Sequence, residues 1–596
     1  MKVTALARVR LGDSVVGSLA AGALVAAICA ASAPPAMAAD GTDPAAISPF
    51  GVGACAANNR SAEADATWVP QMAAIGVSST RCVSTDWGKV EPEEGTWRWD
   101  GLDAQIKYME DQHFFFGGIL IGKPKWDKAN QKGLPVYNLP GWSKYVSETV
   151  KHCKGRIKYW ELWNEPPNGT GSDKTAPDYA KLAVATYDAA KAADPEAMVG
   201  LAAKSVFINY LDQTIKAGAK GHFDYITLHP YETAGIVLTH PGTEPVYMRI
   251  APTVRKMLAA QDPGKVNCPI IFTEAGAAAD GKWAVKLKGY PATEAQAHAV
   301  VKYYTMGIAQ GITCIDWFEG KDTKSENYYF DGLIDVDGKP RPSYTAMGQL
   351  IKYLGAHPTY LGWVMLNDKH YGFVFQGTNG TVMATWAATW TPDAVAFGQS
   401  VKIVDPQTGK VTGADKVELT LAPILVDGVP ETLVAQAKAS KGKALPWGGD
   451  YTNAKSISVT YGTQNVEKGL HTLSAESIAA DVIAYGGGAR VGTVPGGTTF
   501  LVDPNFMCYT TVPIEITAVV RRNADNAAAT IKLNYESVSG VKDAEPYAVP
   551  ESGDWVTAKW KIDDVQFVSQ YGYNFRFDTG KYVLQSVTVT KVEKGR

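Results

Sequence analysis

Between residues 48 and 355, short apolar runs alternate with longer amphipathic segments eight times, and this alternation constrains the fold more than any other feature of the sequence. Apolar runs of about 4–8 residues are typical of buried strands, whereas apolar residues spaced three and four apart are typical of helices. Strands that alternate with helices form parallel sheets, because each helix returns the chain to the same edge of the sheet. The predicted strands are 49–55, 79–84, 114–121, 157–163, 197–202, 223–228, 269–273 and 312–317. The predicted helices are 64–75, 100–111, 139–154, 176–193, 208–219, 245–260, 292–310 and 341–354.

Eight such units match a (β/α)8 barrel, which typically takes about 250 residues. The alternative is an open, doubly wound α/β sheet, which would need a glycine-rich dinucleotide turn after the first strand. Gly51 and Gly53 follow that pattern, but the chain then continues through Ala56 and Ala57 without a third glycine in register. We therefore predict an α/β TIM barrel over residues 48–355.

The helical period stops after residue 355, and short alternating segments separated by turn residues take over. Such segments are typical of all-β modules. We predict a small β-sandwich over 356–436, a linker over 437–450 that is rich in Lys, Gly and Ala, and a second β-sandwich over 451–596. The second sandwich is a candidate carbohydrate-binding module, because Tyr571 and Tyr573 would share one face of a strand, although core packing accounts for them equally well.

The N-terminal segment has the pattern of a secretory signal peptide over residues 1–38. Lys2, Arg8 and Arg10 precede an apolar run that leads to the small residues around Ala38. A membrane anchor is the alternative, but the apolar run is short, and no later stretch reaches the about 20 apolar residues that a span needs. We therefore expect a secreted protein with no membrane span.

Composition excludes several partners. The chain has 57 basic and 60 acidic side chains and a formal net charge of -3, so it lacks the basic character of a nucleic-acid-binding protein. Its 7 cysteines show no CxxC spacing, which indicates neither a zinc site nor a disulfide framework, although Cys55 and Cys82 could pair across neighbouring strands. We predict no cofactor and no metal, and the sequence leaves the oligomeric state open.

Two glutamates follow predicted strands at the end of the barrel where chemistry takes place. The fourth strand leads to Asn164 and Glu165, and the seventh leads to Glu274. Paired carboxylates at a barrel mouth suit hydrolysis of a glycosidic bond, because one can give a proton to the leaving oxygen while the other attacks the anomeric carbon.

The segment Trp163-Asn164-Glu165-Pro166, with Glu274 after a strand about a hundred residues later, resembles clan A of the retaining glycoside hydrolases. The resemblance implies that Glu165 is the acid/base, that Glu274 is the nucleophile, and that Asn164 contacts the sugar 2-hydroxyl. It also implies roles for residues at other strand ends. The arginine and tyrosine that hold the nucleophile would be Arg81 and Tyr231, the strand-six histidine would be His229, and Trp317 would form the floor under the cleaved sugar.

Segments 87–103 and 332–344 resemble units of family 39 and family 5 barrels. In family 39 the nucleophile is typically followed by Trp-Asn, whereas Ala275 and Gly276 follow Glu274, so other families of the clan stay open. Loop tryptophans are candidates for stacking on sugar rings. They are Trp87, Trp126 and Trp283.

The sequence thus predicts a secreted, retaining β-glycoside hydrolase that acts on a β-linked carbohydrate, which the appended modules suggest is polymeric. The sugar and the choice between endo and exo action stay open. The alternative is a non-catalytic barrel that binds carbohydrate or serves at the cell surface. A metal-dependent barrel enzyme is a more distant alternative, because His229 is the only histidine well placed at the mouth.

Overall fold

The computed structural model describes most of the chain beyond residue 46. The described residues are 47–53, 61–83, 85–130, 133–167, 175–323, 330–473, 479–482 and 487–592. The predicted signal peptide and Cys55 lie outside the described residues, so the predictions of secretion and of a Cys55–Cys82 pair stay predictions.

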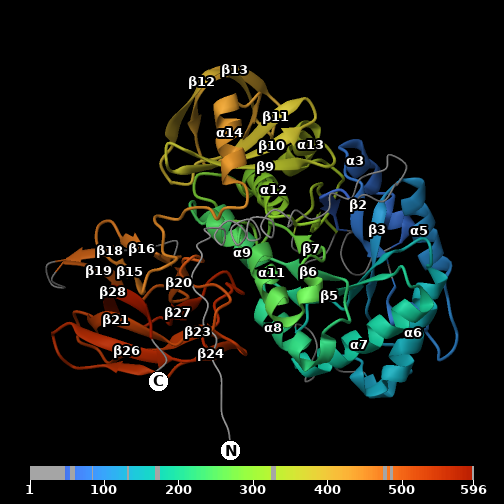
Figure 1. The fold of residues 1–596 in the computed structure, drawn as a ribbon, viewed down its shortest axis with the longest axis horizontal. Helices are drawn as coiled ribbons and strands as arrows, with labels where there is room; N and C mark the ends of the chain where they lie inside the picture. Colours follow the sequence, from blue (N-terminus) through green and yellow to red (C-terminus); the bar gives the residue numbers. More distant parts are fainter. Residues whose placement is uncertain are drawn as a thin grey trace, which may run out of the picture. The chain divides into compact units, whose positions relative to one another are not determined.

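Eight parallel strands close into a barrel, which Figure 1 shows in blue to green. They are β1 (Phe50–Val52), β2 (Ser79–Val83), β3 (Phe115–Leu120), β4 (Tyr159–Leu162), β5 (Met198–Lys204), β6 (Tyr225–His229), β7 (Ile270–Ala275) and β8 (Cys314–Trp317). The barrel closes where β1 pairs with β8, with Gly51 opposite Asp316. A Cβ at Gly51 would lie 2.3 Å from Oδ1 of Asp316, so only glycine leaves room for this buried carboxyl. The predicted barrel is confirmed.

Helices connect the strands, as the sequence predicts. They are α2 (Ala62–Asp65), α3 (Val69–Ala74), α4 (Trp87–Val90), α5 (Asp100–Asp111), α6 (Leu139–His152), α7 (Ala176–Ala193), α8 (Ile208–Thr214), α9 (Tyr231–Thr239), α10 (Glu244–Tyr247), α11 (Ile250–Gln261), α12 (Ala292–Ala309) and α13 (Pro342–Leu354). The two longest predicted helices before β5 each begin with a side chain that caps a free backbone N–H. The Thr175 side chain accepts from Asp178 N at the start of α7, and the Asn138 side chain accepts from Gly141 N at the start of α6. The nine-residue helix α9 was not predicted.

A six-stranded antiparallel sheet follows the barrel, in the order β13-β12-β14-β11-β10-β9. Its strands are β9 (Thr359–Leu366), β10 (His370–Gly377), β11 (Gly380–Thr385), β12 (Asp393–Val404), β13 (Val411–Leu419) and β14 (Ile424–Asp427). Helix α14 (Glu431–Ser440) packs against β9. The predicted linker began at residue 437, but residues 437–440 belong to this helix, because Ala and Lys are good helix formers and Val434 and Ala437 face the core of the sheet.

The C-terminal part is all-β and sandwich-like, with a seven-stranded, a five-stranded and a two-stranded antiparallel sheet. The strands are β15 (Ser456–Thr460), β16 (Val466–Lys468), β17 (Leu470–Thr472), β18 (Ala479–Val482), β19 (Gly487–Val491), β20 (Thr498–Val502), β21 (Ile514–Arg522), β22 (Ala529–Ile531), β23 (Leu533–Ser537), β24 (Gly540–Asp543), β25 (Tyr547–Val549), β26 (Val556–Ile562), β27 (Phe575–Phe577) and β28 (Tyr582–Lys591). Alternating residues of β21 and β26 are buried, as expected for strands that cover a core on one face.

Both appended parts contact the barrel through buried groups. Phe373 of β10 and Trp386 belong to the same hydrophobic core as the barrel, and Trp386 Nε1 donates to Glu244 Oε1 at 2.7 Å. In the C-terminal part, the carbonyl oxygens of Ser537 and Gln566 accept from Asn209 Nδ2 at 2.8 and 3.0 Å. Among the helices of the described residues, none has the length and apolar character that crossing a membrane requires.

Candidate active site

The carboxyl ends of the barrel strands bring five polar side chains together. Glu165 and Asn164 follow β4, Arg81 lies on β2, His229 ends β6 and Glu274 lies on β7. Glu165 has a φ of 50°, in the left-handed region that non-glycine residues rarely adopt. Such backbone strain concentrates at functional sites, where the surrounding structure holds it.

Arg81 connects three of these strands through one guanidinium group. Its Nη1 lies 2.5 Å from Glu274 Oε1, and its Nε lies 2.6 Å from Glu161 Oε2 on β4. Its Nη2 donates to Asn164 Oδ1 at 2.8 Å. The planar fork of an arginine suits such simultaneous, directional contacts. Arg81 therefore fixes the distance between the β4 and β7 sides of the barrel mouth.

Glu274 is held from two sides. The Tyr231 hydroxyl donates to Glu274 Oε2 at 3.0 Å, while Arg81 binds the other oxygen. Burial and then the charge of Glu274 hold the pKa of Tyr231 well above its usual value, so this hydroxyl remains a donor throughout the physiological range. The Glu274 side chain is 15% exposed, so it can still be reached from the mouth.

His229 links Glu165 to the barrel interior. Its Nδ1 lies 3.0 Å from Glu165 Oε1, and its Nε2 lies 3.0 Å from Thr273 Oγ1. The Thr273 hydroxyl donates its only proton to Glu161 Oε1 at 3.0 Å, so it must accept from His229. Nε2 of His229 therefore carries a hydrogen, and Nδ1 faces Glu165 Oε1 at 3.0 Å and Glu274 Oε2 at 3.5 Å.

Charges around His229 favour its protonated form. Burial alone would lower the pKa of the imidazole, but the charge of Glu274 and the hydrogen bonds to Glu161 and Glu165 outweigh burial and raise it to about 9. Glu161 shows the converse balance, since burial would raise its pKa but the charge of Arg81, with help from His229, lowers it to about 2. The interior thus supplies a permanent anion beneath the two glutamates.

The distance between Glu165 and Glu274 limits the chemistry available to them. One oxygen of each carboxylate and one nitrogen of His229 lie within 4.8 Å of one another. In retaining glycosidases the two carboxyl groups are about 5–5.5 Å apart, whereas inverting enzymes leave about 6.5–9.5 Å for a water molecule. A closest approach of this size is compatible with the shorter separation that double displacement uses.

The same three side chains are also the kind of donors that bind a divalent metal. Here Glu274 Oε1 already accepts from Arg81 Nη1 and Glu274 Oε2 from the Tyr231 hydroxyl, so a cation on Glu274 would compete with both donors and lie beside the guanidinium charge. The donor set therefore fits a hydrogen-bonded carboxylate pair better than a metal centre.

The predicted tryptophans lie in different environments. Trp317 and Trp87 are fully buried: the Trp317 Nε1 donates to the Asp331 carbonyl at 2.8 Å, and the Trp87 ring stacks with that of Tyr145. Neither offers an open ring face to a sugar in this structure. Trp126 is half-buried and donates to the Glu91 carbonyl, whereas Trp283 is 56% exposed.

Sequence reasoning missed the interior layer of the site. Glu161 and Thr227 are buried and contact each other, with Thr227 Oγ1 donating to Glu161 Oε1 at 2.9 Å. The alternation of side chains along a strand could have identified Glu161. It lies two residues after Tyr159 on β4, so both side chains point to the inward face of the barrel. Asp316 is a further buried carboxyl, whose pKa burial raises to about 8 against the opposing charge of Arg81.

Sequence reasoning also missed a contribution from the C-terminal part to the barrel mouth. The Tyr571 ring meets Phe207 edge-on at 4.9 Å between ring centroids, and Nζ of Lys204, the last residue of β5, lies 5.9 Å from the Tyr571 ring centroid. Tyr571 is 37% exposed, so part of its ring stays open beside the mouth. Tyr573, in contrast, packs against the apolar cluster around Trp447.

No protein-family model matches the chain. It is 26% identical over 176 residues to an endo-1,4-beta-xylanase A of Xylanibacter ruminicola, a match that covers 24% of this chain and 47% of the relative. It is 28% identical over 156 residues to an endo-1,4-beta-xylanase A of Phanerodontia chrysosporium, covering 23% and 37% of the two chains. The chain thus spans less than half the length of these curated relatives.

Among solved structures, the chain is similar to a family 39 glycoside hydrolase from the gut symbiont Bacteroides cellulosilyticus WH2. The TM-score is 0.52 at 17% identity, with 64% of this chain and 81% of that chain covered. The chain resembles clan A glycoside hydrolases. At this identity, the likeness to the solved structure concerns the fold, and the chemistry of this chain has to be argued from its own side chains.

Proposed function

We propose that the protein is a retaining β-glycoside hydrolase in which Glu165 is the acid/base and Glu274 the nucleophile. The observation that carries the proposal is the pair itself: two carboxylates within 4.8 Å of each other in different hydrogen-bonding environments. Glu274 is bound by the donors Arg81 and Tyr231, whereas Glu165 faces an imidazole that can exchange a proton with it.

In the first step, an oxygen of Glu274 attacks the anomeric carbon and the bond from that carbon to the leaving oxygen breaks. The proton of Glu165 goes to the leaving oxygen, so the products are a free alcohol and a glycosyl ester of Glu274. In the second step, Glu165 takes a proton from a water molecule whose oxygen attacks the same carbon. The ester bond breaks, and the sugar leaves with its original configuration.

The residues around the pair support these roles. Arg81 and Tyr231 would hold the nucleophile at one distance from Glu165 through both steps, which limits the entropy lost on reaching the transition state. Asn164 is fixed by Arg81 and lies next to Glu165 in the chain, where its amide could bind the sugar 2-hydroxyl. His229 Nδ1, 3.0 Å from Glu165 Oε1, would orient the Glu165 carboxyl, while Glu165 itself regains its proton from water in the second step.

For the substrate, the two curated relatives are named as endo-1,4-beta-xylanases, which makes β-1,4-xylan the first polymer to test. The exposed Trp283 and Tyr571 and the half-buried Trp126 would extend the binding surface beyond the cleaved bond. The buried Trp87 and Trp317 would shape the walls. The N-terminal signal pattern suits a secreted enzyme that meets its polymer outside the cell.

The test is hydrolysis of β-linked polysaccharides and aryl β-glycosides by the purified protein and its Glu274→Ala variant, followed through new reducing ends. We expect release by the wild type and a loss of at least about 10⁴-fold in the variant, because an alanine side chain cannot form the ester. The matched control is Glu93→Gln, which changes an exposed carboxylate on a barrel loop and should leave the rate unchanged. Binding of a glycan by the folded protein without any hydrolysis would favour the non-catalytic barrel instead.

A further inference from the structure

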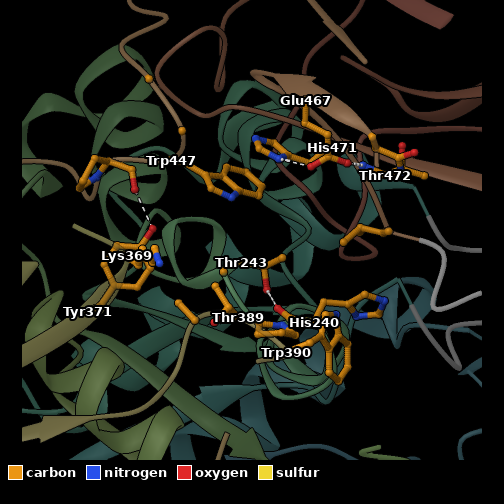
Figure 2. A pocket seen from close by; sticks show the side chains of 18 of the residues that line it. His240, Thr243, Lys369, Tyr371, Thr389, Trp390, Trp447, Glu467, His471 and Thr472 are labelled. Carbon is orange, nitrogen blue, oxygen red and sulfur yellow. Dashed lines mark hydrogen bonds and ion pairs between the residues drawn. The ribbon is translucent and has the colours of Figure 1, made fainter. Parts of the chain in front are cut away.

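A hollow of about 850 Å³ lies away from the catalytic glutamates, where three parts of the chain meet. The barrel contributes the segment after α9 that includes His240 and Thr243, and the six-stranded sheet contributes Lys369 and Trp390. The C-terminal part and the segment leading to it contribute Trp447 and residues 465–473. Figure 2 shows these side chains surrounding one open space, with His240 and Trp390 opposite Trp447 and His471.

The walls of this junction pocket are held by hydrogen bonds. The Tyr371 hydroxyl donates to the Pro446 carbonyl at 2.6 Å, which joins the six-stranded sheet to the segment before β15. On the opposite wall, Glu467 binds His471 Nδ1 at 2.9 Å and accepts from Thr472 N at 3.0 Å. The His471 ring stacks on Trp447 with centroids 3.7 Å apart. The pocket is therefore preformed, as ligand sites usually are.

The lining combines an open aromatic surface with many hydrogen-bonding groups. Trp390 is 52% exposed, which is unusual for so large an apolar ring. Trp447 is only 8% exposed and forms part of the pocket wall. Lys369, whose Nζ lies 3.7 Å from Asp393 Oδ2, and Asp368 add opposite charges to the lining, and Thr389 precedes Trp390 in the chain. An exposed indole with hydroxyls and balanced charges suits a neutral ligand that has apolar ring faces and many hydroxyls, as a sugar does.

Helix α9 connects this pocket to the catalytic centre. The helix begins at Tyr231, whose hydroxyl binds Glu274, and ends at Thr239, next to His240 of the pocket. Its 9 residues span about 13 Å at 1.5 Å per residue. A ligand that is a chain of several sugars could therefore be held at the pocket while another part of the same polymer reaches the barrel mouth.

We infer that the junction pocket is a second carbohydrate-binding site, in which Trp390 stacks on a sugar ring of a β-linked glycan. The inference rests on the proposed function for the identity of the glycan, but its binding chemistry is separate from Glu165 and Glu274. It assigns the binding role to the junction of the three parts rather than to one face of the C-terminal sandwich.

The test measures binding of soluble xylan, mixed-linkage glucan, mannan and galactan by affinity gel electrophoresis. The Glu274→Gln variant of the full chain is used as the background, so that the polymers stay intact. We expect at least one glycan to retard this protein and Trp390→Ala to weaken that binding about 10-fold, as for loss of an aromatic contact. Trp390→Phe should keep most of the affinity. The matched control is Tyr137→Ala, which removes another exposed ring, 64% exposed, from the barrel.

The outcomes separate this inference from the proposed function. Trp390→Ala in the otherwise wild-type chain should keep the kcat/KM for a small aryl β-glycoside, because such a substrate does not reach the junction pocket. Loss of retardation in Trp390→Ala without any hydrolysis by the wild type would support the site and overturn the enzyme proposal. Equal retardation with and without the Trp390 ring, or hydrolysis of a glycan that retards none of these proteins, would overturn the site.

Discussion

At the scale of single residues, the charge that organises the mouth is Glu161, which the substrate cannot touch. Its carboxylate accepts from Arg81, Thr227 and Thr273, and it is 2% exposed. Through Arg81 it positions Glu274, and through Thr273 it fixes the hydrogen on Nε2 of His229. The orientation of both proposed catalytic groups therefore depends on one buried anion.

We predict that Glu161→Gln lowers kcat about 10²-fold, because small displacements of positioned groups cost that much. The variant should also unfold more easily, by about 3 kcal/mol, since it leaves the buried Arg81 with less compensation. A readout specific to positioning is the titration of His229 itself: without the Glu161 charge the pKa of His229 falls, so its imidazole NMR signals should titrate at lower pH. Thr227→Val, which removes one donor and no charge, should leave that titration in place.

The titration of His229 predicts how stability depends on pH. Its pKa is about 9 in the folded protein, above the ordinary value of 6.5, so the folded state binds this proton more tightly than the unfolded state. The stabilisation is therefore complete below about pH 6.5 and is lost as the pH rises through about 9, and it amounts to roughly 3 kcal/mol. Urea unfolding of the wild type and His229→Gln at pH 6 and pH 10 would measure it. The difference in unfolding free energy between the two proteins should shrink at pH 10; a difference that is the same at both values would contradict this account.

At the scale of elements, the strands and long helices could be predicted because each shows a clear period. Helix α5 and helix α7 have the predicted bounds, Asp100–Asp111 and Ala176–Ala193. Helix α9 could not be predicted in this way, because its sequence, YETAGIVLT, is apolar on several sides and has no polar stripe to mark a helix. This unpredicted element nevertheless carries Tyr231 and leads to the junction pocket.

In the candidate site too, local patterns could be predicted from the sequence, but packing between distant elements could not. Glu165 and Glu274 could be predicted to lie together because they occur at the carboxyl ends of strands, which meet at one face of a barrel. The resemblance to clan A added Arg81, His229 and Tyr231, and the structure brings all five to that face. The exposure of Trp87 and Trp317 could not be predicted, because burial depends on packing between elements that are distant in the chain. The approach of Tyr571 to the barrel likewise depends on contacts between separate parts.

The loop that carries Tyr571 is organised by a buried carboxylate. Glu536 accepts from the backbone N–H groups of Val568 and Ser569 at 2.9 and 3.0 Å and from Asn574 Nδ2 at 2.8 Å. Burial raises its pKa to about 7, which these hydrogen bonds oppose. The loop is thus tied to the sandwich core while its tip contacts Phe207 of the barrel.

We predict that Tyr571→Ala raises KM several-fold for oligosaccharides of the glycan that the protein hydrolyses and leaves kcat/KM for a small aryl β-glycoside within about 2-fold, because the ring lies beside the mouth rather than at the reacting carbon. Steady-state kinetics on both substrates would measure the split. Tyr547→Ala, which removes a partly buried ring within the sandwich, is the control for effects on the C-terminal part alone. A loss of equal size on both substrates would place Tyr571 in the chemistry instead.

At the scale of the whole molecule, the barrel and the six-stranded sheet share one core. Tyr371, Phe373 and Trp386 of the sheet belong to the same buried cluster as the barrel helices, and Lys302 Nζ lies 5.2 Å from the Trp386 ring centroid. Burial lowers the pKa of Lys302 to about 8, with the charge of Glu244 opposing the shift. Removing the sheet would expose these apolar residues together with a weakly compensated buried lysine.

We therefore predict that a chain ending at Leu354 is insoluble or unfolded, although it contains every strand of the barrel. A chain ending at Gly448, which keeps the six-stranded sheet, should retain more helical circular dichroism and a cooperative thermal transition. The reason is that the longer fragment keeps the residues that the six-stranded sheet adds to the shared core and loses only the smaller contribution of the C-terminal part, which includes Tyr509 and Val568. Expression of a soluble, cooperatively folding barrel from the shorter fragment would contradict the shared core.

The most direct test of the central claim is the configuration of the first product. Proton NMR of the reaction on a β-linked glycan that the protein hydrolyses, recorded before mutarotation, distinguishes the two anomers. The placement of Glu165 and Glu274 predicts that the β-anomer forms first and equilibrates later. First release of the α-anomer would mean that water attacks directly, and Glu274 could then not be the nucleophile.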